Sequence, residues 1–324
     1  MRRILIALSS AALFALLVTP QAPQLVDDGF LPENDMKIPV GSKSAKGMSE
    51  AQFNKVLDKV EALYGPIIQE KGGVLEINRL WEDSTVNAST QRIGNRYILN
   101  MYGGLARHDA ITQDGFALVV CHELGHQVGG APKYAYQWAS NEGQADYYAS
   151  LKCMRKVFSS ASTKDFSRMA ASDPVAEQAC AAAHKSAAQR ALCVRNAMAG
   201  LSVTGLFASF GNGPAPKLDT PDPKVVASTQ DKHPASQCRL DTYFQGSLCP
   251  VSASKDVSDD DAALGTCTAS QGHSVGLRPR CWYKPPSSES LNIAAKFGAP
   301  AADVKASMAK SGAFSQLNNS SVVW

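Results

Sequence analysis

Apolar residues recur at helical spacing along much of the chain, and this pattern predicts a mostly helical protein. The first such stretch follows Ser49, which forms a capping box with Gln52 and marks the start of a helix. The glycine pair at 72–73 ends this helix. Its apolar positions are Phe53, Val56, Leu57, Val60 and Leu63.

Two short runs have the composition of β-strands. Residues 74–81 follow the glycine pair, and residues 96–102 end at a second pair of glycines. The next helix starts at Thr112 or Asp114, since either side chain can cap it, and runs through an apolar stretch to Gln127. A third glycine pair ends this helix.

Helical patterns dominate the part of the chain that follows. We predict a helix over residues 137–158 and two more that start at Asp173-Pro174 and Ser186 and end near Phe210. Beyond Phe210, prolines break the regular pattern. The expected fold class is therefore α+β and mostly helical, with a small sheet and a cysteine-rich C-terminal segment with its tail over residues 246–324.

The N-terminus has the pattern of a secretory signal. Arg2 and Arg3 precede an apolar stretch over residues 4–18, which is shorter than the roughly 20 residues that a bilayer span needs. We predict a signal peptide over residues 1–22, with an uncleaved anchor helix as the alternative. Residues 23–47 lack periodicity and are predicted to be a linker or an arm on the surface.

Charge and hydropathy argue against two classes of partner. The formal net charge is +3, and it falls to +1 once Arg2 and Arg3 are removed, so neither nucleic acid nor an anionic membrane surface is expected as a partner. The uncharged stretch at residues 197–210 is too short to cross a bilayer. No membrane span is expected after removal of the signal.

The eight cysteines are even in number, and none has the CxxC spacing of a metal or redox site. In a chain that is exported to the periplasm or the medium, such cysteines favour disulfides. Proximity along the chain suggests the pairs Cys238 with Cys249 and Cys267 with Cys281. Cys121 lies off the predicted metal-binding face of its helix, which favours a disulfide or a buried thiol.

Residues 122–126 read His-Glu-Leu-Gly-His, the HExxH motif of zinc hydrolases. Because residues four apart lie on one face of a helix, His122 and His126 can bind one Zn²⁺ while Glu123 reaches its open position. Such a zinc ion lowers the pKa of a bound water, and Glu123 then accepts the proton and passes it to the leaving amine.

A third ligand is expected on the following helix. Glu142 and Asp146 lie four residues apart on one helix face, so Glu142 can complete the zinc site. We expect Asp146 to accept the free imidazole N–H of a zinc-bound histidine. An HExxHxxGxxH site would need a histidine where the chain has Pro132, which excludes that alternative.

Taken together, these motifs resemble the HtpX/CAAX-prenyl-protease family of zinc peptidases, a group of gluzincins. The similarity extends over about residues 48–245, which we take as the metallopeptidase domain. The matching features are HELGH at 122–126, Glu142 with Asp146, Asn87-Ala88, Ser228-Thr229, His233-Pro234 and Arg239.

The resemblance implies a mixed α/β metallopeptidase core, with zinc on the three ligands named above and Glu123 as the catalytic base. It also implies that His233 lies at the active site, where it either hydrogen-bonds the tetrahedral intermediate or plugs the metal in a latent state. Residues 97–105 would form an edge strand that pairs with an extended substrate.

The sequence thus favours an exported zinc endopeptidase acting on peptides or unfolded proteins. The alternative is a quality-control or chaperone-like zinc protein of the cell envelope with slow or latent proteolysis. A catalytically silent zinc module is disfavoured because a purely structural site needs no base such as Glu123.

Overall fold

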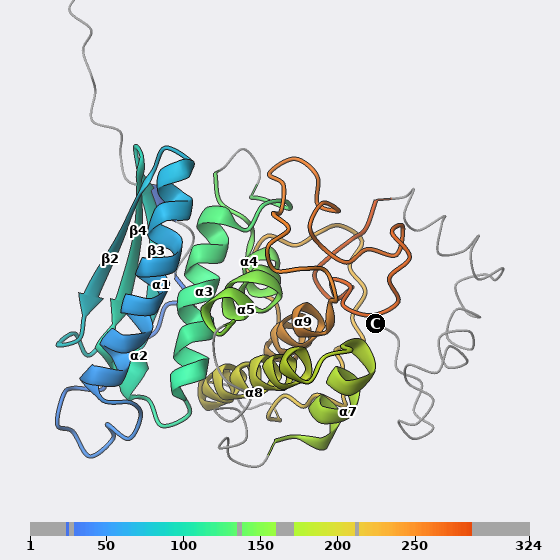
Figure 1. Ribbon diagram of the computed structural model, residues 1–324. Coiled ribbons are helices and arrows are strands. Elements are labelled where there is room, and N and C mark those ends of the chain that lie inside the picture. The colour runs from blue at the N-terminus through green and yellow to red at the C-terminus, as the bar shows by residue number, and fades with distance from the viewer. Residues whose placement is uncertain (1–23, 26–28, 135–137, 160–171, 211–213, 287–324) are drawn as a thin grey trace, which may run out of the picture.

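The computed structural model describes residues 24–25, 29–134, 138–159, 172–210 and 214–286 (Figure 1). The signal peptide expected over residues 1–22 and the end of the C-terminal tail lie outside these residues. Within them the protein is α+β and mostly helical, which confirms the predicted fold class.

A mixed sheet forms one side of the molecule, with strand order β1-β3-β4-β2 (Figure 1). The predicted strands are confirmed as β2 (Val74–Leu80) and β4 (Arg96–Tyr102), which pair in parallel. Strand β3 (Ala88–Ile93) pairs antiparallel with β4 and was missed because polar residues dominate it. The two-residue strand β1 (Gln24–Leu25) pairs with β3.

The expectation of an edge strand over residues 97–105 is wrong. Strand β4 lies inside the sheet, with β3 on one side and β2 on the other. Its backbone groups are therefore used by its neighbours and cannot pair with a substrate. After Tyr102 the chain turns into the short helix α2 (Gly103–Arg107), so residues 103–105 are not part of a strand.

Helix α1 (Glu50–Glu70) begins at the predicted capping box and packs on the sheet. Helix α3 (Gln113–Val128) lies between this layer and the other helices, as Figure 1 shows. Thr112 caps it by accepting a hydrogen bond from the backbone N–H of Gly115 at 3.0 Å. Every residue from Gly115 to Gln127 is buried, so α3 is the central helix of the core.

The predicted helix over residues 137–158 begins later, at Glu142. Asn141 is its N-cap and accepts a hydrogen bond from the backbone N–H of Gln144 at 3.0 Å. The helix consists of three consecutive pieces: α4 (Glu142–Tyr148), the π-helical turn η1 (Ala149–Cys153) and α5 (Met154–Val157).

Three further helices cover the other side of α3 and α4. Asp173 caps α7 (Pro174–Ala183), and α8 (Ala187–Phe210) packs against α3, α7 and α9 (Ser236–Leu248). Helix α8 extends beyond the uncharged stretch at 197–210. By its length and composition alone, it could cross a membrane. Half of its apolar window is buried inside the protein.

The segment before α1, expected to be a surface arm, is buried in part. Phe30 and Leu31 are buried in the main core. The side chain of Asn87 fixes this segment, because its Oδ1 accepts from the backbone N–H of Leu31 at 2.9 Å and its Nδ2 donates to the Leu31 carbonyl at 3.1 Å. Apolar side chains too few to form a periodic pattern can still complete a core.

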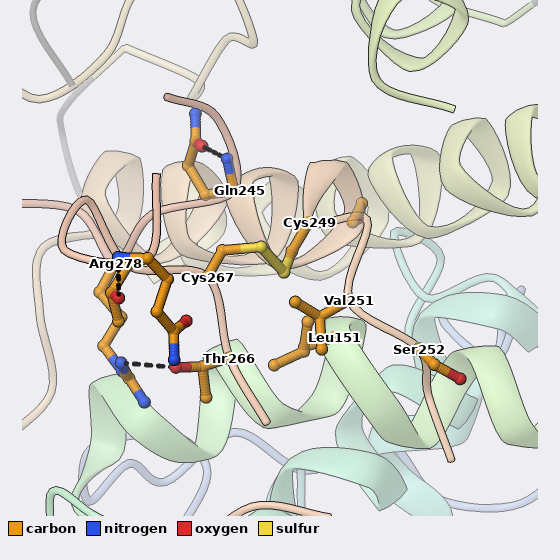
Figure 2. The surroundings of a disulfide bond; sticks show 12 residues. Leu151, Gln245, Cys249, Val251, Ser252, Thr266, Cys267 and Arg278 are labelled. Atoms are coloured by element: carbon orange, nitrogen blue, oxygen red, sulfur yellow. Dashed lines mark hydrogen bonds between the residues drawn. A yellow bond between two sulfur atoms is a disulfide. The ribbon is translucent and has the colours of Figure 1, made fainter. Parts of the chain in front are cut away.

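All eight cysteines form disulfides, which indicates an oxidising, exported environment. The expected pairs Cys238–Cys249 and Cys267–Cys281 are wrong, because folding rather than proximity along the chain decides which cysteines meet. Figure 2 shows the Cys249–Cys267 bond above Leu151 of η1 and close to Val251. The four bonds are Cys121–Cys153, Cys180–Cys193, Cys238–Cys281 and Cys249–Cys267.

Candidate metal centre

Helix α3 brings two imidazoles together in the core. The Nε2 atoms of His122 and His126 are 3.0 Å apart, and both residues are buried. Gly125 between them allows α4 to approach closely, since a Cβ there would lie 2.7 Å from the carbonyl oxygen of Ala145. The glycine of the HELGH sequence therefore has a packing role beside the site.

Helix α4 supplies the carboxylate. Oε2 of Glu142 lies 3.3 Å from Nε2 of His122, and Oε1 lies 3.4 Å from Nε2 of His126. Two ligands of a tetrahedral zinc ion at about 2.05 Å are separated by about 3.4 Å, so these spacings suit one small cation. His122, His126 and Glu142 form a group that could hold a metal ion.

Buried polar atoms without a partner mark the same place. Oε2 of Glu142, Oε1 of Glu123 and Nε2 of His233 are buried and make no hydrogen bond with any residue that the structure describes. Orphaned polar groups of this kind are rare in folded proteins and indicate a missing ion, water or ligand. Two imidazoles and one carboxylate are also the donor set of a catalytic zinc site with an open position. The residues therefore fit zinc.

The far nitrogens of both histidines are occupied by acceptors. Nδ1 of His122 lies 2.7 Å from Oδ1 of Asp146, and Nδ1 of His126 lies 2.8 Å from the carbonyl oxygen of Ser140. A carboxylate or carbonyl at Nδ1 fixes the proton there and leaves the Nε2 lone pair for a metal. Asp146 thus lies where the sequence placed it.

Asp146 is itself held by α9. Arg239 donates from Nε to Oδ2 and from Nη2 to Oδ1, both at 2.8 Å, and Tyr243 donates its hydroxyl to Oδ1 at 2.5 Å. A third guanidinium nitrogen, Nη1, donates to the Phe30 carbonyl at 2.9 Å. Sequence reasoning noted Arg239 only as a feature shared with the zinc peptidases and did not single out Tyr243, because their distance from the motif along the chain hides this contact.

Protonation before a cation binds follows from burial and charge. Burial disfavours charge on His122, but the carboxylates of Asp146 and Glu142 outweigh it and raise the pKa to about 9. Burial lowers the pKa of His126 to about 4 and raises that of Glu123 to about 8. Despite burial, the neighbouring histidines hold the pKa of Glu142 well below its usual range. Cation binding must therefore displace a proton from His122.

His233 approaches the site from the loop before α9. Its Nε2 atom lies 3.2 Å from Oε2 of Glu142, and its side chain is 15% exposed. It is not among the three residues whose ligand atoms lie close enough together to share one ion. Burial lowers its pKa, so the ring is neutral at pH 7.

Tyr134 also belongs to the site, and sequence reasoning missed it. Its hydroxyl donates to Oε1 of Glu142 at 3.0 Å, and its ring lies 6.4 Å from that of His126 at an interplanar angle of 28°. The loop between α3 and α4 carries Tyr134 and has no periodic pattern, so no sequence signal pointed to it.

The cysteine-rich segment supports α4 from the opposite side. A Cβ at Gly143 would collide with the indole of Trp282, so the ring packs directly on the helix backbone. Arg278 donates from Nε to Oε1 of Gln144 at 2.7 Å, and Figure 2 shows the same side chain beside Thr266. The helix that carries Glu142 is thus fixed by residues far away along the chain.

Comparisons of this chain with family models, with curated proteins and with solved structures give no match.

Proposed function

We propose that this protein is an exported zinc endopeptidase. The observation that carries the proposal is the unpaired, buried carboxylate oxygen of Glu123 beside a group of two imidazoles and one carboxylate that could hold a metal ion. A structural zinc site would use a fourth protein ligand and would need no adjacent base. Four disulfides support export, to the periplasm or to the medium.

His122, His126 and Glu142 would hold the zinc ion, which supplies a polarised carbonyl and a water of lowered pKa when bound. With zinc bound, Glu123 would serve as the general base that accepts a proton from water and as the general acid that passes it to the leaving amine. Asp146 keeps the Nδ1 proton on His122 and orients its ring. Tyr134 holds Oε1 of Glu142, which leaves the orphaned Oε2 for the metal.

His233 has two candidate roles, namely a donor to the substrate's carbonyl oxygen or a plug on the metal. Its position outside the group of three ligands favours the first role. A neutral imidazole at this place can donate to an oxygen that becomes negative in the transition state. The gluzincin core suggested by the resemblance to the HtpX/CAAX-prenyl-protease family is supported by the contacts of Glu142, Asp146 and Arg239.

One observation favours slow or latent proteolysis, as in the quality-control alternative. The three ligands and Glu123 are all at most 2% exposed, and the side chains of Tyr134 and His233 also contact Glu142, so a peptide cannot reach the ligands in this conformation. An enzyme that must open before it binds cuts slowly and selects unfolded chains. This alternative shares the chemistry above and differs in rate.

The test is cleavage of a reduced and alkylated protein by the zinc-loaded wild type and by Glu123→Gln, with zinc content measured by mass spectrometry. Glu70→Gln, at an exposed residue of α1, is the matched control. We expect the wild type and Glu70→Gln to cut, while Glu123→Gln binds equal zinc and loses about 10³-fold or more of the activity.

Cleavage by Glu123→Gln at the wild-type rate would remove Glu123 from the mechanism. Absence of zinc from the wild type would refute the metal centre itself. A zinc-loaded wild type that cuts nothing would leave the binding-protein alternative as the better description.

A further inference from the structure

Arg92 lies between two aromatic rings at the C-terminal end of α3. Arg92 on β3 lies directly opposite Tyr97 on β4, and its guanidinium carbon is 4.0 Å from the centre of the Tyr97 ring. The same carbon lies 4.6 Å from the centre of the Trp138 ring, in the loop between α3 and α4. Cation–π contacts with two aromatic rings restrict the orientation of the guanidinium.

Hydrogen bonds tie this side chain to the metal-binding helix. Nε of Arg92 donates to Oε1 of Gln127 at 3.1 Å, and Nη2 donates to the Gln127 carbonyl at 3.0 Å. Gln127 directly follows the zinc ligand His126, and its own Nε2 donates to Oγ1 of Thr90. The positive charge is therefore held against the last turn of the helix that carries His122 and His126.

This charge has no carboxylate partner in the described part of the chain. Arg79, Arg96, Arg195 and Arg239 each form a salt bridge, whereas Arg92 forms none. The carboxylate of Asp259 acts on this charge from a distance, but it is 68% exposed and pairs with Lys133 at 2.8 Å. Arg107 also lacks a carboxylate, but all three of its nitrogens donate to carbonyl oxygens.

Arg92 differs from Arg107 because its Nη1 makes no hydrogen bond to any described residue. Burial lowers the pKa of Arg92, because a half-buried guanidinium is stabilised less by water. Beside it, Nε1 of Trp138 is a buried donor with no acceptor among the described residues. A half-buried cation and an unused donor next to a peptidase site call for an anionic acceptor from outside.

We propose that Arg92, flanked by Tyr97 and Trp138, binds a carboxylate of the peptide substrate close to the scissile bond. A guanidinium offers a planar fork of N–H donors that suits a carboxylate. The Arg92 side chain contacts α3, whereas β1 pairs with the backbone of β3. The pairing of β1 therefore does not involve the proposed subsite. This inference rests on the proposed peptidase function, and it makes the enzyme selective for an acidic side chain or for a free C-terminus.

The test uses neutral peptides with blocked ends, in which one Glu or the matched Gln is moved along the positions around the cleaved bond. A second pair carries a free or an amidated C-terminus at the same distances. The variants are Arg92→Met, which keeps the apolar stem, and Arg92→Lys. Arg96→Met is the control, because Arg96 is a surface arginine of β4 paired with Glu76.

We expect the wild type and Arg96→Met to prefer Glu over Gln at one position by about tenfold or more in kcat/KM, the effect of one charge-assisted hydrogen bond. Arg92→Met should reduce this ratio to near one, and Arg92→Lys should retain part of it. If only the free C-terminus gives the preference, the bound carboxylate is the terminal one.

Binding to zinc-loaded Glu123→Gln, measured by fluorescence anisotropy with the same peptides, separates this inference from the proposed function. Cleavage without any preference for a carboxylate overturns the subsite and leaves the peptidase intact. Selective binding to this variant, with no cleavage by the zinc-loaded wild type, supports the subsite and refutes the peptidase. Peptides that are neither cut nor bound overturn both. If Arg92→Met fails to fold, the ratios of the wild type and Arg92→Lys decide.

Discussion

In the half of the molecule built from the sheet, α1 and α3, one large apolar cluster holds the elements together and extends into η1, α5 and α8. In the half built from α9 and residues 249–283, the apolar clusters are small, and disulfides and buried arginines join the segments. The apolar residues that pack the first half recur periodically along the sequence, whereas the segments of the second half largely lack such a pattern.

The candidate metal centre lies where these halves meet. His122 and His126 come from the apolar helix α3, whereas the position of α4, which carries Glu142, depends on Arg239, Trp282 and Arg278. The comparison teaches that the geometry of the site is set by residues that are not ligands. Changes in the second half should therefore affect the affinity for zinc as well as stability.

The largest effect is expected from Arg239→Met. The substitution leaves Asp146 buried and uncompensated, and breaking a buried pair lowers the free energy of unfolding by about 3–5 kcal/mol. Zinc affinity should fall about 10- to 100-fold because Asp146 orients His122. Urea unfolding and a zinc titration measure the two effects.

The matched control is Arg79→Met at the surface of the first half. Arg79 pairs with Asp58 and Glu61, which are 66% and 49% exposed, so the loss should stay below about 1 kcal/mol. Equal losses for the two variants would contradict the division between the halves.

A smaller loss is expected when Cys249 and Cys267 are both replaced by alanine. A bond that closes a loop of 18 residues lowers the entropy of the unfolded chain, which raises the free energy of unfolding by about 3 kcal/mol at 25 °C. Because this bond anchors the segment that packs on α4, zinc affinity should fall in parallel. Unchanged thermal unfolding and zinc binding would show that packing alone holds the segment.

A pH effect is expected from Asp241 in α9. Burial raises the pKa of its carboxyl to about 7 in the folded protein, above the ordinary value of 3.8. Between these two values the folded state binds more protons than the unfolded state, so this group lowers stability as pH rises from about 4 to about 7. Asp241→Asn should remove that part of the slope in unfolding experiments at stepped pH. An unchanged slope would assign it to other groups.

The smallest effect is expected from Tyr134→Phe. Loss of one hydrogen bond to a charged carboxylate corresponds to about 1.5–3 kcal/mol at most, and partial exposure of the ring should reduce this. Zinc affinity should weaken by about tenfold while stability changes little, since the ring remains. Replacement of zinc by Co²⁺ allows absorption spectra to report any change in coordination. Identical spectra and affinity would exclude a role for Tyr134 in holding Glu142.

Local signals predicted much of the fold. The capping box at Ser49, the cap at Thr112 and the strands at 74–80 and 96–102 depend on residues close in sequence, and each was found. Strand β3 was missed because it is polar and is stabilised by pairing with β4 rather than by its own pattern. Pairing with a neighbouring strand produces little recognisable pattern in the sequence of either strand.

The sequence by itself determined the three residues that can share a metal ion, because helical spacing alone brings His122 to His126 and a capped helix follows with Glu142. Only the tertiary structure decided which cysteines pair, that β4 is internal, and that Phe30, Tyr134 and Arg239 surround the site. The reason is physical. Helix geometry acts over four residues, whereas these contacts join residues separated by up to about two hundred positions and exist only once the chain has packed.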